Sequence, residues 1–282
     1  MKFEYISSIG ENIIISNKSL YLLKNYSGFD MPDTDRKTTK GYGQDGVTFN
    51  AITLKPREMK ITGYINGSSR TETENEIDRL MLSFRQKETG ILRCTTDCKS
   101  MDIECITTQL EVPYQKNWRF QEFTLNLIGP KVFFTDTSDN FVELTSWEGG
   151  MKFPFRLPVK LAHRGEPTVK IFNDGHEDTP VLIIFRGPAE RPKIQNLTTG
   201  SYVAVNQQLA EDEVLFISTE YENEYIEIEK NGVRANAYNR IDPHGALDMT
   251  LKVGDNVLKY SSNSPAQTNA VEIRYRRRYL SI

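Results

Sequence analysis

Residues 41–46 read Gly-Tyr-Gly-Gln-Asp-Gly and match the G-x-G-x-x-G pattern of dinucleotide-binding loops. In such loops the glycines follow a buried strand and open a helix whose N-terminus holds a pyrophosphate. Here a charged segment, residues 35–40, precedes the glycines, and a strand-like segment, residues 47–54, follows them. The context is wrong on both sides, so we predict no nucleotide site.

Cys94, Cys98 and Cys105 are three potential metal ligands within twelve residues. Structural zinc requires four ligands, and most zinc sites include a C-x2-C pair. The three histidines of the chain lie far away in sequence, at His163, His176 and His244. We therefore expect reduced thiols in a cytosolic β-structure and no metal site.

Residues 220–229 hold five glutamates, a composition that could suit a metal site or general acid–base chemistry. In a strand, Glu220, Glu222 and Glu224 share a face with Ile226 and Ile228, which indicates a solvated face that merges into the core. Catalysis needs groups that converge in a cleft, not a row along one strand. No nucleophile motif or phosphate-binding loop is present, so we predict a non-enzyme with no catalytic or cofactor-binding residue and no cofactor.

Length and composition set the broad class. The 282 residues are 38% hydrophobic and 26% charged with a net charge of −3, which predicts two domains and no specific nucleic-acid binding. The strand pattern breaks over residues 129–140, so we place the domains at 1–137 and 138–282. No apolar run reaches the length of a membrane span, and the first twenty residues lack the apolar centre of a secretory signal. The four Asn-x-Ser/Thr sequences are then attributed to chance: Asn17, Asn25, Asn66 and Asn196.

Alternating apolar and polar residues predict strands in the first half, notably at residues 11–15, 47–54 and 59–65. The polar segment 27–46, with four glycines and seven charges, predicts a structureless loop of the kind that a partner orders. In the strand predicted at 118–128, a change of parity indicates a bulge near Gln121 or Glu122.

One segment, residues 71–90, has the spacing of a helix. Thr71 and Glu74 have capping-box spacing. An apolar stripe at i, i+3, i+4 and i+7 comprises Ile77, Leu80, Met81 and Phe84. We expect this stripe to be buried against a sheet.

The second half is a series of short strands separated by turn residues, which predicts a sandwich or jelly roll. Residues 270–282 close the series as one strand. Its buried face would hold Val271, Ile273, Tyr275 and Tyr279. The arginines on its polar face require acidic partners, either within the subunit or in a neighbour.

The order of these elements resembles that of siphophage distal tail proteins. The first half of the likeness is carried by residues 43–46 before a strand, Arg57 at the head of the next strand, the lone helix and residues 123–134. Residues 147–158 are similar to the hinge of that family. The second half is carried by residues 180–187, 192–200, 255–258 and the Arg/Tyr-rich end.

The resemblance implies an all-β fold, with an N-terminal β-sandwich and its one helix followed by a C-terminal galectin-like jelly roll. It also implies a hexameric ring that serves as baseplate hub in the virion tail of a siphophage or prophage, after assembly in the host cytoplasm. The hub would join the tail tube protein to the tail-associated lysin or tail-tip protein, with a receptor-binding protein as a further partner. The alternative is a carbohydrate-binding, lectin-like β-sandwich protein, because jelly rolls often bind sugars through exposed aromatic side chains. The candidate aromatic residues of such a sugar site are the loop tyrosines Tyr221 and Tyr238 and the two tryptophans, Trp118 and Trp147.

Overall fold

The computed structural model describes residues 1–115, 118–144, 147–148, 163–164, 167–263 and 271–282. The chain forms two compact units, Met1–Thr137 with Tyr279–Ile282, and Ser138–Arg278. Among the regular elements of the described residues, all are strands except for one α-helix and one short 3-10 helix, which confirms the predicted all-β class. The last four residues belong to the first unit, so the second unit does not extend to residue 282 as predicted.

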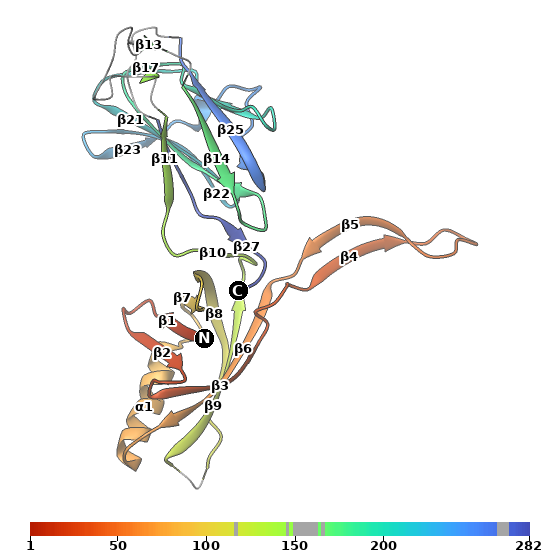
Figure 1. The fold of residues 1–282 in the computed structure, drawn as a ribbon, viewed down its shortest axis with the longest axis vertical. Coiled ribbons are helices and arrows are strands. Elements are labelled where there is room, and N and C mark those ends of the chain that lie inside the picture. The colour runs from red at the N-terminus through yellow and green to blue at the C-terminus, as the bar shows by residue number, and fades with distance from the viewer. Residues whose placement is uncertain (116–117, 145–146, 149–162, 165–166, 264–270) are drawn as a thin grey trace, which may run out of the picture. The chain divides into compact units, whose positions relative to one another are not determined.

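The first unit is built on one nine-stranded sheet in the order β27-β10-β8-β7-β1-β2-β3-β6-β9 (Figure 1). Its strands are β1 (Lys2–Ile6), β2 (Asn12–Ser16), β3 (Tyr21–Ser27), β6 (Arg57–Asn66), β7 (Thr89–Thr95), β8 (Ser100–Glu111), β9 (Phe120–Gly129), β10 (Phe134–Asp136) and β27 (Arg278–Tyr279). β8 also pairs with β9, so the sheet closes on itself through seven strands.

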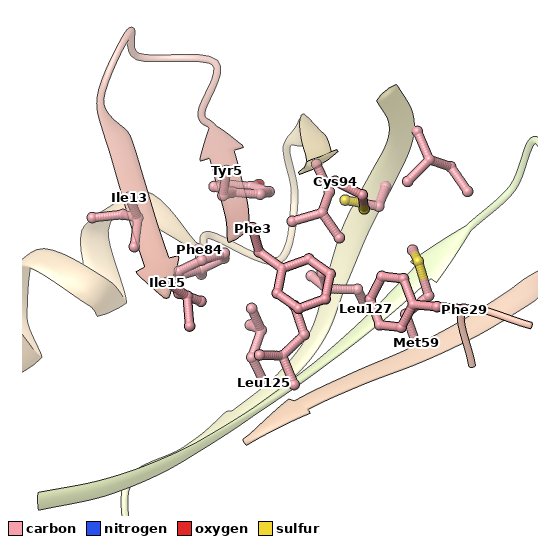
Figure 2. Close-up of a cluster of buried hydrophobic side chains, with 14 of the residues drawn as sticks. Phe3, Tyr5, Ile13, Ile15, Phe29, Met59, Phe84, Cys94, Leu125 and Leu127 are labelled. Atoms are coloured by element: carbon pink, nitrogen blue, oxygen red, sulfur yellow. The ribbon is translucent and has the colours of Figure 1, made fainter. Parts of the chain in front are cut away.

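Apolar and polar residues alternate in these strands, and the apolar side chains point inward and fill the interior of the barrel. In β6, for example, Met59, Ile61 and Ile65 are buried while their polar neighbours face outward. Figure 2 shows the centre of the core, where Phe3 and Phe29 lie close to Leu125 and Leu127 of β9. Burial of these aromatic and branched side chains stabilises the closed sheet.

The N-cap of the helix α1 (Arg70–Ser83) lies two residues before the predicted one, Thr71. This N-cap is Ser69, whose Oγ accepts a hydrogen bond from the Glu72 N–H, while the Glu72 carboxylate accepts one from the Ser68 N–H. The prediction of Thr71 and Glu74 as the capping pair is therefore wrong.

The buried stripe of α1 is also narrower than predicted. Leu80 and Phe84 are buried as predicted and Ile77 packs against the core, but Met81 is 45% exposed. The reason is that Thr73 occupies an inward position. Thr73 and Leu80 lie one above the other on the side of the helix that faces the core. Met81 lies about 100° further around the helix and is therefore exposed.

The predicted bulge near Gln121 or Glu122 is wrong. The β6–β9 register runs without a shift from Arg57–Gly129 to Asn66–Phe120. Trp118 lies in the turn before β9, and Phe120 faces outward at 43% exposed. The change of parity therefore reflects two aromatic side chains outside the core, not an inserted residue.

The second unit packs a six-stranded sheet, β11-β26-β16-β21-β22-β23, and a four-stranded sheet, β14-β25-β18-β19, around one apolar core. Their strands are β11 (Asn140–Leu144), β14 (Thr168–Asn173), β16 (Leu182–Arg186), β18 (Lys193–Asn196), β19 (Tyr202–Ala204), β21 (Glu213–Glu220), β22 (Asn223–Lys230), β23 (Val233–Asn236), β25 (Gly254–Ser261) and β26 (Val271–Tyr275). Shorter elements complete the unit: β12 (Trp147–Glu148), β13 (His163–Arg164), β15 (Thr179–Pro180), β17 (Ala189–Glu190), β20 (Gln208–Leu209), η1 (Tyr238–Arg240) and β24 (Thr250–Leu251). The predicted hinge, residues 147–158, lies outside the described residues except for β12.

The predicted closing strand, residues 270–282, is two strands. Val271 and Ile273 of β26 lie in the core of the second unit, whereas Tyr279 of β27 lies in the core of the first. The predicted polar face holds Arg274, Arg276 and Arg278. The first two have acidic partners within the chain, in the ion pairs Arg274–Glu272 and Arg276–Asp139, and the neighbouring Arg277 pairs with Asp174.

Candidate assembly interface

The strands β4 (Thr34–Thr39) and β5 (Thr48–Leu54) form a two-stranded ribbon, which we call the arm. Among the described strands they pair only with each other, and the ribbon projects from the barrel of its own unit (Figure 1). The prediction of a structureless loop over residues 27–46 is therefore wrong. β4 is polar throughout and exposed on both faces, so it carries no alternation from which a strand could be predicted.

The arm has one apolar face. In sequence, Phe49 has the opposite parity to Ile52 and Leu54, which would place it on the other side of the strand. The register shifts between Lys37 and Thr38, where Asn50 is the extra residue on β5. A bulge of this kind restores the parity, so Phe49, Ile52 and Leu54 lie on the same face.

The apolar face of the arm is open to solvent. Phe49 is 59% and Ile52 58% exposed, and Val47, which precedes β5, is also exposed. The opposite face is polar and includes Asp35 and Thr53, which are paired across the ribbon. The arm is thus amphipathic, and no described residue of the first unit covers Phe49 and Ile52 on its apolar side. Exposed apolar surface with a polar reverse side is typical of a protein-binding element.

The arm leaves the barrel at Gly28. This residue has a φ of +86°, and a Cβ built on it would lie 1.9 Å from the carbonyl oxygen of Glu58. Only glycine fits this conformation and this close approach of two backbones. The next residue, Phe29, is buried, with its ring centroid 4.8 Å from that of Phe3 and 6.2 Å from that of Phe134. The root of the arm is therefore fixed to the core.

The arm returns to the barrel at Arg57, the first residue of β6, which is only 2% exposed. Its Nε donates to the Val132 carbonyl at 3.0 Å and its Nη2 to the Leu280 carbonyl at 2.7 Å. Its Nη1 donates to the carbonyls of Gly28, at 3.0 Å, and Asp30. The guanidinium carbon lies 4.6 Å from the centroid of the Phe134 ring. Burial lowers the pKa of Arg57 below its ordinary value, and the nearby Asp30 carboxylate opposes this effect.

The glycine pattern at residues 41–46 forms the tip of the arm. Gly43 and Gly46 have φ values of +74° and +80°, and Tyr42 is fully exposed beside them. The segment joins two strands of a ribbon and opens no helix. The glycines therefore serve to turn the chain.

The three cysteines are separated by burial. Cys94 and Cys105 lie in the barrel core, and Cys98 is exposed in the turn between β7 and β8. Burial raises the pKa of Cys105 to about 12, so its thiol is protonated at neutral pH. His176 and His244 lie on the surface of the second unit. Within the part of the chain that the structure describes, no three His, Cys, Asp or Glu side chains are grouped to hold a metal ion.

The glutamates of residues 220–229 span the hairpin of β21 and β22. Ile226 and Ile228 are buried, and Glu227 and Glu229 form ion pairs with Arg234 of β23 at 3.5 and 2.9 Å. The predicted single strand with Glu220, Glu222 and Glu224 on the face of Ile226 and Ile228 is wrong, because Glu220 ends β21 and Glu222 lies in the turn. Only Glu224 shares β22 and its face with the two isoleucines.

The aromatic side chains expected of a sugar site lie in separate elements. Tyr221, 76% exposed, sits in the turn after β21, and Tyr238 begins the short helix after β23. Trp118 is partly exposed in the first unit, and the side chain of Trp147 lies outside the described residues. No helix in the described ranges has both the length and the apolar character of a membrane span.

Sequence reasoning missed the roles of Gly28 and Arg57 at the root of the arm. A signal for Arg57 exists, because it shares the inward parity of Met59, Ile61 and Ile65 in the same strand. A charged residue at an inward position requires buried partners. The sequence could have predicted a buried arginine, but not which carbonyl groups bind it.

Two family models match the chain. Residues 15–128 match the phage tail protein RIFT-related domain, and residues 174–279 match the C-terminal domain of the siphovirus-type tail component. Together the two matches cover most of the chain and one falls in each unit. A search of the curated proteins finds no match.

Solved structures share the fold. The crystal structure of the Dit protein of phage SPP1, described as a paradigm of the hub of the adsorption apparatus in phages that infect Gram-positive bacteria, superposes with a TM-score of 0.70 at 13% identity. That match covers 97% of this chain and 98% of the SPP1 chain. A chain of the phage P2 baseplate in its activated conformation with Ca matches with a TM-score of 0.57 at 11% identity, covering 100% of this chain and 99% of that one.

Proposed function

Because the chain belongs to the siphophage distal tail protein family, whose members are structural components of phage tails, we propose that it forms a ring-shaped hub at the tip of the tail. The ring is a hexamer built by the first unit. It joins the tail tube protein to the tail-associated lysin or tail-tip protein, with a receptor-binding protein as a further partner. The protein acts in the virion tail of a siphophage or prophage, after assembly in the host cytoplasm, and catalyses no reaction.

The open apolar face of the arm is the observation that carries this proposal. A two-stranded ribbon is marginally stable alone in water and needs a covering surface. Its exposed apolar residues, Phe49 and Ile52, would be covered by the barrel of the next copy. A contact in which one surface binds a different surface of the next copy is head to tail, and it closes into a ring when the rotation is suitable. A projecting arm that binds the barrel of the next copy is therefore consistent with a ring-shaped hub.

Similar folds support the proposal. The SPP1 Dit protein is described as the hub of an adsorption apparatus, and the second matching chain is part of a baseplate. At 13% and 11% identity these likenesses show a shared architecture. The physical argument for assembly therefore comes from the arm of this chain.

The mass in solution tests the proposal directly. We expect the full chain to show a concentration-dependent mass that reaches that of a hexamer in analytical ultracentrifugation. Replacing residues 34–54 by a short Gly/Ser linker should give a folded monomer, because both ends of the arm are fixed to the barrel by residues outside the deletion. A full chain that stays monomeric at high concentration would refute the ring.

A matched pair of arm variants tests which face binds. Ile52→Asp places a charge on the apolar face, and Ala51→Asp places the same charge one residue away on the polar face, opposite Lys37. We expect Ile52→Asp to abolish the oligomer and Ala51→Asp to leave it nearly unchanged, because a buried unpaired charge is strongly unfavourable whereas a carboxylate opposite a lysine is not. Equal effects of the two substitutions would exclude the apolar face as the contact.

A further inference from the structure

We propose that Arg57 is the positioning residue of the arm and that the segment Tyr279–Ile282 completes its binding site. The arm would then have a fixed direction only when the end of the chain is docked on the barrel of the first unit. This inference rests on the proposed role of the arm in ring assembly. It names the residues that hold the arm ready for its contact.

Arg57 holds both strands of the arm at their root. The outgoing strand passes Gly28 and Asp30, whose carbonyl groups bind Nη1. The returning strand ends at Leu54, and only two residues separate it from Arg57, so the backbone of Arg57 is the point at which the arm re-enters the sheet. Between them, the Lys55 N–H donates to the Asp33 carbonyl at 2.8 Å. The side chain of Arg57 thus connects the segment that enters the arm with the segment that leaves it.

The site requires arginine. Its hydrogen-bond acceptors are main-chain carbonyls of residues 28, 30, 132 and 280, which lie in different segments of the chain. A guanidinium group offers five N–H donors in a plane and can stack on the Phe134 ring at the same time. Lysine has three donors on one atom and no flat face, so it cannot reach the same carbonyls. The loss of any one acceptor leaves a buried donor without a partner, which is costly.

The chain end supplies one of these acceptors. Leu280 provides its carbonyl to Nη2, and two residues later the Ile282 N–H donates to the Phe29 carbonyl at 3.3 Å. Tyr279 is buried, and its hydroxyl donates to Asp136 Oδ1 at 3.2 Å. Residues 279–282 therefore contact the root of the arm at two points and the barrel core at a third. Undocking this segment would free Nη2 and the Phe29 carbonyl together.

Local hydrogen exchange of the amides at residues 29–34 and 53–58 measures the mobility of the root. We compare the full-length protein with Arg57→Lys and with a variant that lacks residues 280–282. Both changes should accelerate exchange at the root by about tenfold or more relative to the barrel strands β1 and β7, because hydrogen bonds to a charged group are among the stronger ones. Both should also weaken the oligomer.

Arg93→Lys is the matched control. Arg93 is a partly buried arginine of the same barrel, and its Nε and Nη2 bind both oxygens of Asp102 at 2.8 and 2.9 Å. This variant should leave exchange at the root unchanged. Faster exchange that is uniform over the barrel in Arg57→Lys would indicate general destabilisation and would overturn the positioning role, as would unchanged exchange at the root.

The two proposals fail separately. If the unaltered chain never oligomerises, the ring is refuted, yet root exchange still decides the role of Arg57. If the root loosens in both variants and the oligomer is as stable as before, arm direction does not control assembly and this inference is wrong. If only Arg57→Lys loosens the root, the chain end is not part of the site.

Discussion

Consecutive strands β5 and β6 have similar sequence patterns and opposite environments. β6 alternates along its length and β5 alternates on either side of its bulge, and only Lys55 and Pro56 separate the two strands. In β6 every second residue is buried, whereas in β5 every residue is exposed except the half-buried Leu54. Alternation therefore predicts a strand in both cases, but it does not predict that the same chain supplies the covering surface.

The difference shows what an exposed apolar face means in this protein. β6 has neighbours on both sides, β3 and β9, and its inward face fills the barrel. β5 has one neighbour, β4, which has no apolar residue to offer. A bulge at Asn50 nevertheless gathers the apolar residues of β5 on one side. A strand with its apolar residues on one face and no covering surface supports the proposed contact of the arm with a second copy.

The largest expected effect on the free energy of unfolding is that of a substitution in the buried strand β6. Ile61 of β6 is completely buried in the barrel core. Ile61→Ala should lower the free energy of unfolding of the first unit by about 2–5 kcal/mol, because it removes core contacts and leaves a cavity. Urea denaturation that follows the transition of the first unit measures this loss. A loss below about 1 kcal/mol would mean that β6 is less tightly packed than its burial indicates.

An intermediate effect on the free energy of unfolding is expected at Gly28, where the arm leaves the barrel. Gly28→Ala introduces a Cβ at a φ of +86° and next to the Glu58 carbonyl oxygen, so the backbone must move. We expect a loss of about 1–3 kcal/mol in the unfolding of the first unit. Gly43→Ala is the control, because Gly43 also has a positive φ but no atom lies within 4 Å of its Cβ position. Equal losses in the two variants would show that contact with Glu58 is unimportant.

The sequence predicted the elements better than their surroundings. The strands near residues 11–15, 47–54 and 59–65 and the single α-helix follow from periodicity, because a strand or helix with one buried face imposes its period on the sequence. β4 could not be predicted in the same way, since a strand without a buried face imposes no period. Met81 was misassigned because Thr73, a polar residue, takes an inward position on α1.

The candidate interface was predicted only in outline. A partner for the segment 27–46 followed from its length and polarity, but the apolar face lies on β5, outside that segment. The Arg57 site depends on carbonyl groups at residues 28, 132 and 280. Main-chain acceptors have no residue type, so no sequence pattern identifies them. The split of residues 270–282 between two cores follows from the tertiary fold and has no local signal.

The smallest effect on unfolding is expected for the counterpart of Ile61 on the arm. Ile52 is 58% exposed, so Ile52→Ala in the monomer should change the free energy of unfolding by no more than about 0.5 kcal/mol, the usual range for surface substitutions. The same change should weaken the oligomer measurably, because the apolar area that Ile52 loses is buried only in the complex. Urea denaturation at a concentration where the protein is monomeric, compared with sedimentation at high concentration, separates the two quantities. A large loss of unfolding free energy in the monomer would mean that the arm folds back onto its own barrel. The exposed face of β5 would then belong to one of two states of the arm and would not be a surface for a second copy.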